Sequence, residues 1–191
     1  MGLEDALQSW ERQWRATGAL VDEILAPGLD AETVRAALGR DDVHPDVLAW
    51  FGWNNGGATH TWDALPSGRL LLDLQTSIAF QSRLKDSMDV VGQFEDGVEF
   101  RESYLPILDN DHNDIVFVDL DTGEVYRWEI EPWTEHSQVL LLIGRDLESV
   151  VRLWMAVLDR LQVRFHPGQV YFDVDRSQVD SDLVDRGVCR V

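Results

Sequence analysis

Apolar residues that recur every three or four positions predict helices in the first part of the chain. Asp30 is a suitable N-cap for a short helix over residues 31–38, and Gly39 is suited to end it. An earlier stripe predicts an amphipathic amino-terminal helix that Gly18 is placed to interrupt; its members are Leu3, Leu7, Trp10, Trp14 and Val21.

Three further segments have helical patterns. Pro45 suits the first turn of a helix that is expected to end at residues 54–57, where the sequence Asn-Asn-Gly-Gly favours a left-handed termination. Residues 76–88 form the next predicted helix. Asp146 is a good N-cap for a closing helix with an apolar stripe of Leu147, Val150, Val151, Trp154, Leu158 and Leu161.

Short apolar or alternating runs predict strands. Tyr126 and Trp128 alternate with Arg127 and Glu129, which places the two aromatic side chains on one face of a strand. Gly123 suits the positive φ of the tight turn before that strand. The predicted strands cover residues 70–74, 104–108, 115–120, 125–130, 139–143 and 169–174.

This order of elements predicts an α+β fold. We expect a mainly antiparallel sheet that helices cover on one side, with N-terminal helices and a long C-terminal helix. The 191 residues fit one domain, and residues 175–191, rich in Asp and Arg, read as a loosely held tail.

Charge narrows the classes of function. The chain has 35 acidic and 16 basic residues, for a net charge of −19, so free nucleic acid would be repelled. No apolar run approaches the roughly eighteen residues of a membrane span, and the amino terminus lacks a signal pattern. We therefore expect a cytoplasmic protein without a membrane partner, in which the single Cys189 has no catalytic role.

The negative charge is concentrated in residues 92–137, which contain thirteen acidic residues but only Arg101 and Arg127 as basic ones. Part of this segment, residues 104–130, reads as strands with an acidic rim. Two explanations stay open at this point. The acids form a solvated surface that keeps the protein soluble, or they form a surface for a basic partner.

The loop between the first two of these strands resembles the start of a calcium site. Asp109, Asp111 and Asn113 alternate as oxygen ligands should. The pattern then fails, because position six is Asp114 instead of Gly and position twelve is Leu120 instead of Glu. We expect a turn in which Asp and Asn side chains bind their own backbone, and no metal.

Other catalytic or metal-binding patterns are missing from the sequence. The five His residues are isolated from one another, and neither HExxH nor CxxC occurs. There is no GxSxG elbow and no Gly-rich phosphate loop. His112 lies between acids but lacks an orienting third group. A carboxylate pair for glycoside hydrolysis stays open only because so many acids are present that any two can meet in space.

Several short motifs, in this order, resemble the SUKH superfamily, which is named after fungal cell-wall regulators of the Smi and Knr type. The resemblance covers about residues 20–162. It departs from the family at Asn113, where a Gly is expected, and at Arg35 and Ala36, where a Glu is common. The motifs are LAPGL at 25–29, HPDVL at 44–48, WNNGG at 53–57, LPSGRLLLDL at 65–74, YLPIL at 104–108, IVFVDL at 115–120 and GEV at 123–125.

The resemblance implies a binding protein with a sheet-and-helix fold, no enzymatic activity and no cofactor. Many bacterial members are immunity proteins that neutralise a secreted polymorphic toxin, often a nuclease, and fungal relatives are regulatory interaction modules. An acidic surface independently suits a basic toxin domain. The alternatives are a regulatory scaffold with an endogenous partner, or a calcium-binding protein or hydrolase.

The expected contact surface combines the acidic rim with the end of the helix before residue 57. Acidic residues would supply charge, and Trp53 or Trp62 would supply an aromatic anchor unless both belong to the core. The predicted partner-binding residues are Trp53, Asn54, Asn55, Trp62, Asp109, Asp111, Asp114, Asp121 and Glu124.

Overall fold

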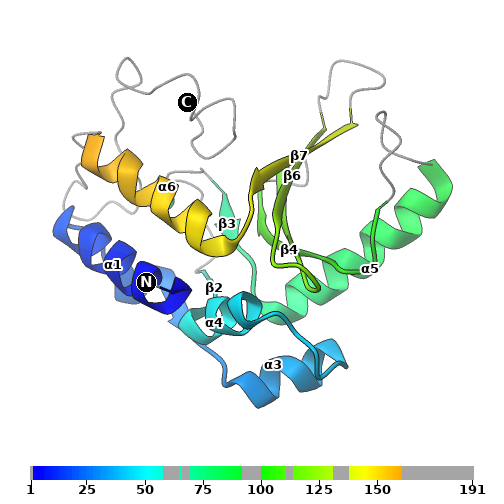
Figure 1. Cartoon of the computed structure of the whole chain (residues 1–191), viewed down its shortest axis with the longest axis horizontal. Coiled ribbons are helices and arrows are strands. Elements are labelled where there is room, and N and C mark those ends of the chain that lie inside the picture. Colours follow the sequence, from blue (N-terminus) through cyan, green and yellow to red (C-terminus); the bar gives the residue numbers. More distant parts are fainter. Residues whose placement is uncertain are drawn as a thin grey trace.

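The computed structural model of the protein describes residues 2–57, 65, 69–91, 100–110, 114–130 and 138–160. This part of the chain combines helices with antiparallel strands (Figure 1). Their order is α1 (Leu3–Ala16), α2 (Val21–Ile24), β1 (Leu25–Pro27), α3 (Ala31–Leu38), α4 (Pro45–Trp53), β2 (Asn54–Gly57), β3 (Leu70–Leu71), α5 (Leu74–Val91), β4 (Tyr104–Asp109), β5 (Asp114–Asp119), β6 (Val125–Ile130), β7 (Gln138–Gly144) and α6 (Leu147–Arg160).

Two antiparallel sheets organise these elements. The larger sheet has five strands in the order β3-β4-β5-β6-β7, so β4 to β7 form a meander in which each strand pairs with the next. The smaller sheet pairs β1 with β2. The α+β class predicted from the pattern is confirmed.

The first helices begin and end where the sequence indicated. Asp30 caps α3 by accepting a hydrogen bond from the backbone N–H of Thr33 at 2.8 Å. Gly39 ends α3 in the left-handed conformation with φ 66°. Gly18, with φ 93°, lies between α1 and α2 and interrupts the helical stripe. Local capping chemistry therefore accounts for these boundaries.

The end of α4 differs from the prediction. Pro45 occupies its first turn as expected, but Asn54 follows the helix with φ −153° and ψ 150°, which is extended backbone. Residues 54–57 form strand β2 instead of a left-handed cap, and the positive φ of 91° falls later, at Gly56. Pairing with β1 satisfies backbone groups of this extended segment.

Helices contact both faces of the larger sheet, so the expectation of a sheet covered on one side is wrong. On one face, Leu105, Val116 and Val118 belong to a core that includes residues of α1, α4 and α6. On the other face, Tyr104, Phe117 and Trp128 are buried in a second cluster that includes Phe80 and Leu84 of α5. Burial on both faces explains why β4 and β5 are buried along their whole length.

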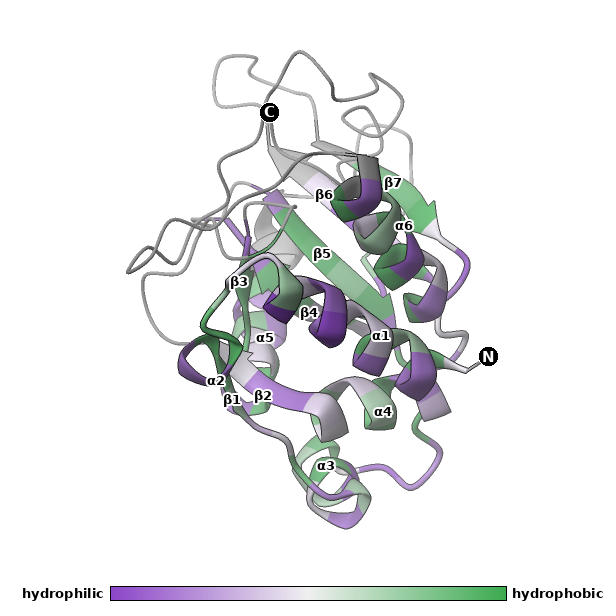
Figure 2. Cartoon of the chain, turned by 90° about the vertical axis from the view of Figure 1, so that its left-hand side faces the viewer, coloured by the Kyte–Doolittle hydropathy of each residue, from purple (hydrophilic) through white to green (hydrophobic). Residues whose placement is uncertain are grey.

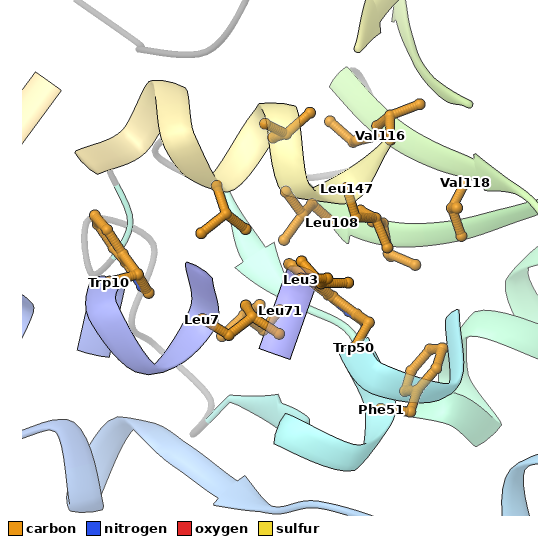
Figure 3. Close-up of a cluster of buried hydrophobic side chains, with 14 of the residues drawn as sticks. Leu3, Leu7, Trp10, Trp50, Phe51, Leu71, Leu108, Val116, Val118 and Leu147 are labelled. Atoms are coloured by element: carbon orange, nitrogen blue, oxygen red, sulfur yellow. The ribbon is translucent and has the colours of Figure 1, made fainter. Parts of the chain in front are cut away.

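Tryptophan side chains hold the helical layer together. The rings of Trp10 in α1 and Trp154 in α6 have centroids 5.5 Å apart, and Trp50 in α4 lies 6.0 Å from Trp154. All three side chains are at most 1% exposed. In Figure 3, Trp10 and Trp50 come from different helices and lie in the same layer as Leu3 and Leu7. The helical layer in front of β5 is seen in Figure 2.

The last described helix, α6, has 14 residues and starts at Leu147. Asp146 precedes it and accepts a hydrogen bond from the N–H of Ser149 at 2.7 Å, as expected for an N-cap. The predicted strand over residues 169–174 and the tail over 175–191 lie outside the described residues. None of the helices in the described part of the chain is long and apolar enough to cross a membrane.

We predict opposite effects on stability for replacement by Ala at Gly28, just after β1, and at Gly52 in α4. A Cβ at Gly28 would lie 1.9 Å from the carbonyl oxygen of Gly52, so Gly28→Ala is expected to destabilise the fold by about 1–3 kcal/mol. A Cβ at Gly52 would lie 3.6 Å from the carbonyl oxygen of Leu29, an ordinary contact, so Gly52→Ala is expected to stabilise the fold by about 0.5–1 kcal/mol. Urea unfolding of both variants measures the difference, and equal effects would contradict the packing.

Candidate protein-binding surface

The acidic rim predicted from residues 104–130 does not form one surface. The loops on either side of β5 leave its opposite ends, with Asp114 at the start of the strand and Asp119 at its end. A strand of this length spans roughly 17 Å at about 3.3 Å per residue. The acids of the rim are therefore divided between two sites at opposite ends of β5.

At the first end, Asp114 is buried between two arginines. Its carboxylate accepts hydrogen bonds from Arg127 Nε at 2.9 Å and from Arg69 Nη2 at 2.5 Å. The side chains of Arg69 and Asp114 are 1% and 10% exposed. Asp109, predicted to be a contact residue, is also buried at 5% exposure. Asp109 and Asp114 are therefore structural, and the prediction that they contact a partner is wrong.

The arginines control the ionisation of Asp114. Burial alone would raise its pKa, but the hydrogen bond from Arg127 and the charge of Arg69 hold the pKa below its ordinary value. Because the carboxylate stays ionised, the group makes charge-assisted hydrogen bonds on both sides. An exposed surface charge would have neither the burial nor these partners.

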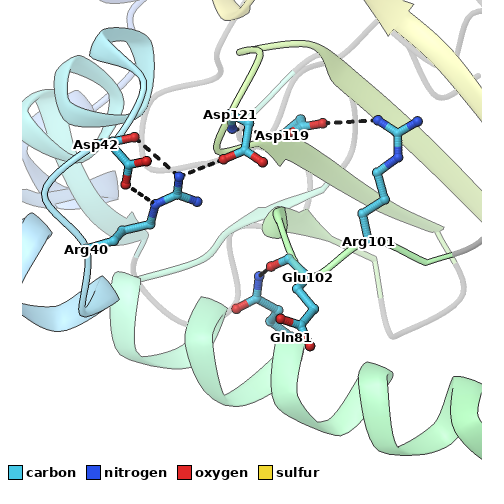
Figure 4. A network of polar contacts seen from close by, with 7 residues as sticks. All are labelled: Arg40, Asp42, Gln81, Arg101, Glu102, Asp119 and Asp121. Carbon is cyan, nitrogen blue, oxygen red and sulfur yellow. Dashed lines mark hydrogen bonds and ion pairs between the residues drawn. The ribbon is translucent and has the colours of Figure 1, made fainter.

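At the second end of β5, the loop between α3 and α4 covers the turn between β5 and β6. Arg40 donates to Asp121 at 2.6 Å and to Asp42 at 2.9 Å, so it bridges the loop and the turn (Figure 4). The ring of His44 packs on Gly123, where an added Cβ would lie 2.5 Å from His44 Cε1. The turn thus needs Gly123 for two reasons, this contact and its φ of 77°.

Asp121 and Glu124 keep part of their exposure at this turn. Asp121 has a side chain 57% exposed despite its ion pair with Arg40. Glu124 is half-buried and accepts a hydrogen bond from the hydroxyl of Tyr126 at 2.8 Å. These two predicted residues can contact a partner, but each is already engaged within the chain.

The predicted contact residues at the end of α4 differ in how far they are buried. Asn54 is 1% exposed, and its Oδ1 accepts from the N–H of Gly56 at 2.7 Å. Asn55 Oδ1 accepts from the N–H of Leu74 at 2.9 Å, which ties β2 to the start of α5. Asn54 is therefore removed from the candidate surface, and Asn55 has its carbonyl oxygen engaged in the fold.

Trp53 is the predicted anchor that keeps an exposed part. Its ring lies edge-on to Trp50, with centroids 5.5 Å apart, and its indole N–H donates to Glu11 Oε2 at 3.3 Å. The side chain is half-buried and lines a groove of about 550 Å³ between α1, α4 and the start of α3. Trp62 and Asp111 lie outside the described residues.

Sequence reasoning did not identify this groove, although α4 contains a signal for it. The segment PDVLAWFGW is apolar around most of the helix, and Val47, Trp50 and Phe51 point into the core. Leu48 and Ala49 are half-buried and line the groove instead. A helix that is apolar all round needs cover on both sides, and the core covers one.

A second group that was missed is the free acids of the helical layer. Each is exposed and makes no ion pair with any described residue; they are Glu4, Asp5, Glu23, Glu32 and Asp41. Across the part of the chain that the structure describes, no three His, Cys, Asp or Glu side chains come together as a metal site would require. The free carboxylates are spread over α1, α2, α3 and the loop after α3.

Neither a protein-family model nor a curated protein matches this sequence. The resemblance to the SUKH superfamily therefore stays a prediction.

Replacing Asp114 tests the buried cluster. Asp114→Asn removes the negative charge that Asp114 places between two buried arginines and is expected to cost about 3–5 kcal/mol of stability. Because the folded-state pKa is depressed, the contribution of Asp114 is fully present above its ordinary pKa of 3.8 and is lost as pH falls through the folded-state value.

The variant should therefore lose less stability on acidification below about pH 4 than the wild type. Asp41→Asn, at an exposed acid with no ion pair, is the control and should change stability by less than about 0.5 kcal/mol. Urea unfolding between pH 7 and pH 3 measures both. A neutral effect of Asp114→Asn would show that the cluster does not hold this end of the sheet.

Proposed function

We propose that the protein is a non-enzymatic binding protein of the immunity type, which neutralises a basic toxin domain in the cytoplasm. The observation that carries the proposal is the placement of the unpaired acids. Exposed carboxylates without ion pairs lie on the helical layer from α1 to the loop after α3, as at Glu4, Glu32 and Asp41. The SUKH resemblance gives the same class of function.

Dispersed carboxylates suit long-range attraction better than chemistry. A metal or general acid–base site needs several groups that converge on one point. A surface that attracts a basic protein needs only a negative potential over its whole area, which raises the rate of encounter. A toxin that binds nucleic acid carries a basic site for phosphates, and an acidic protein can occupy that site.

The buried carboxylate of Asp114 supports the same proposal, because it is unsuited to bind a metal ion. Asp114 is the sixth residue of the calcium-like loop, and both of its oxygens are hydrogen-bonded to arginines. A cation at this carboxylate would have to displace Arg69 and Arg127. Asp114, the residue at which the calcium-like pattern fails, is thus engaged in holding β5 to β6 and to the residue before β3.

Co-expression tests the immunity proposal. The proposal predicts that a basic toxin domain is encoded beside this gene. Cells that produce that domain should survive when the protein is present, and the two proteins should form a complex that elutes together in gel filtration. Growth arrest despite soluble protein would refute an immunity role. A stable complex with an endogenous protein, without any protection, would assign the chain to regulation instead.

Charge reversal tests the surface. Glu4→Lys is expected to slow association with the toxin domain about three- to tenfold at low salt, because it places a repulsive charge on the helical layer. Asp86→Lys in α5 is the matched control, since it changes the net charge equally on an exposed residue of the opposite layer. Its expected effect is below about twofold. Stopped-flow rates at about 0.05 M and about 0.5 M salt measure both, and identical rates for the two variants would remove the helical layer as the contact surface.

A further inference from the structure

The groove beside Trp53 has the form of a binding site for large apolar side chains. Its volume of about 550 Å³ lies within the roughly 300–1,000 Å³ typical of ligand pockets. Leu48 and Ala49 of α4, Leu7 of α1 and Leu29 supply apolar side chains to its lining. Gly52 leaves this wall without a side chain, so the helix backbone is open to a bound group.

Trp53 is held in place before any partner binds. Its ring rests edge-on against Trp50, which is 1% exposed and belongs to the core. Its indole N–H donates to Glu11, and Arg15 in turn holds Glu11 at 2.6 Å. A side chain fixed by packing and hydrogen bonding loses little conformational entropy on binding, which favours an anchor role.

The charge of the groove selects the occupant. Of the ten described residues that line it, Glu4 is the only one with a charged side chain, and none is Lys, Arg or His. Glu4 makes no ion pair with a described residue, and Asp5 beside it is also exposed and unpaired. A segment that brings Lys or Arg to this rim gains attraction, and an acidic segment is repelled.

We infer that the groove between α1, α4 and the start of α3 binds a segment of the partner protein that carries one or two large apolar side chains flanked by Lys or Arg. This rests on the proposed function in that the partner is a basic protein. The apolar side chains fill the space over Gly52 against Leu48 and Trp53. The flanking cations lie at Glu4.

Labelled peptides of about twelve residues provide the probe. The first has Leu and Trp as central anchors and Lys on both sides, the second replaces each Lys by Glu, and the third replaces the anchors by Ala. Fluorescence anisotropy with the full-length protein should show binding of the first peptide and at least about tenfold weaker binding of the other two. If all three bind equally, or the first does not bind, the inference is overturned.

Two variants locate the binding. Gly52→Leu places a side chain in the groove, where its Cβ would make an ordinary contact of 3.6 Å with the carbonyl oxygen of Leu29, and it should weaken binding of the Lys peptide at least about tenfold. Ala36→Leu, at an exposed position of α3 that does not line the groove, is the control and should change binding less than about twofold.

Glu4→Lys should reverse the peptide preference, so that the Glu peptide binds more tightly than the Lys peptide. This test does not depend on whether Gly52→Leu folds. Retained binding by folded Gly52→Leu, or an unchanged preference of Glu4→Lys, overturns the inference. The outcome is separable from that of the proposed function. If Gly52→Leu still protects cells from the toxin, the immunity proposal is supported and the groove is not the toxin-binding site. If the wild type binds the Lys peptide but does not protect cells, the groove is a binding site and the immunity proposal is wrong.

Discussion

The structure depends on where the apolar side chains of α4 lie. This helix of nine residues is apolar on nearly every side, and the core can cover only one of them. Val47, Trp50 and Phe51 join the tryptophan cluster that fastens α1 and α6 in one layer. The remaining apolar surface faces the groove, and Trp53 marks its edge. One helix therefore supplies both the centre of the fold and the wall of its candidate binding site.

Carboxylates in the core and on the surface also differ, because only those in the core need ion-pair partners. A carboxylate at the start of β5 is enclosed by the sheet, so it stays ionised only because Arg69 and Arg127 reach it. Carboxylates on the helical layer meet water and need no partner, as at Glu32 and Asp41. Asp114 is thus neutralised within the fold, whereas several acids of the helical layer make no ion pair with a described residue. The basic partner we propose would be attracted by these unpaired acids of α1 to α3 and of the loop after α3.

Elements set by local chemistry could be predicted from the sequence, and contacts between distant segments could not. The cap at Asp30, the end at Gly39 and the turn at Gly123 follow from residue types at adjacent positions. The burial of Asp114 depends on Arg69, which lies 45 residues earlier. No single segment encodes that pairing. Likewise, α5 covers a second face of the sheet only because β4 to β7 fold back as a meander.

The two asparagines after Trp53 show why residue type alone misplaced part of the site. Polar residues at the end of a helix are typical of an exposed turn, and this favoured a contact role for Asn54 and Asn55. The chain instead continues into β2, where the side-chain oxygen of Asn54 accepts from the N–H of Gly56 and that of Asn55 accepts from the N–H of Leu74 in α5. Those bonds tie α4 through β2 to the start of α5. The two asparagines therefore fix the helix that carries Trp53, and the apolar wall of the groove is the surface that we propose for contact.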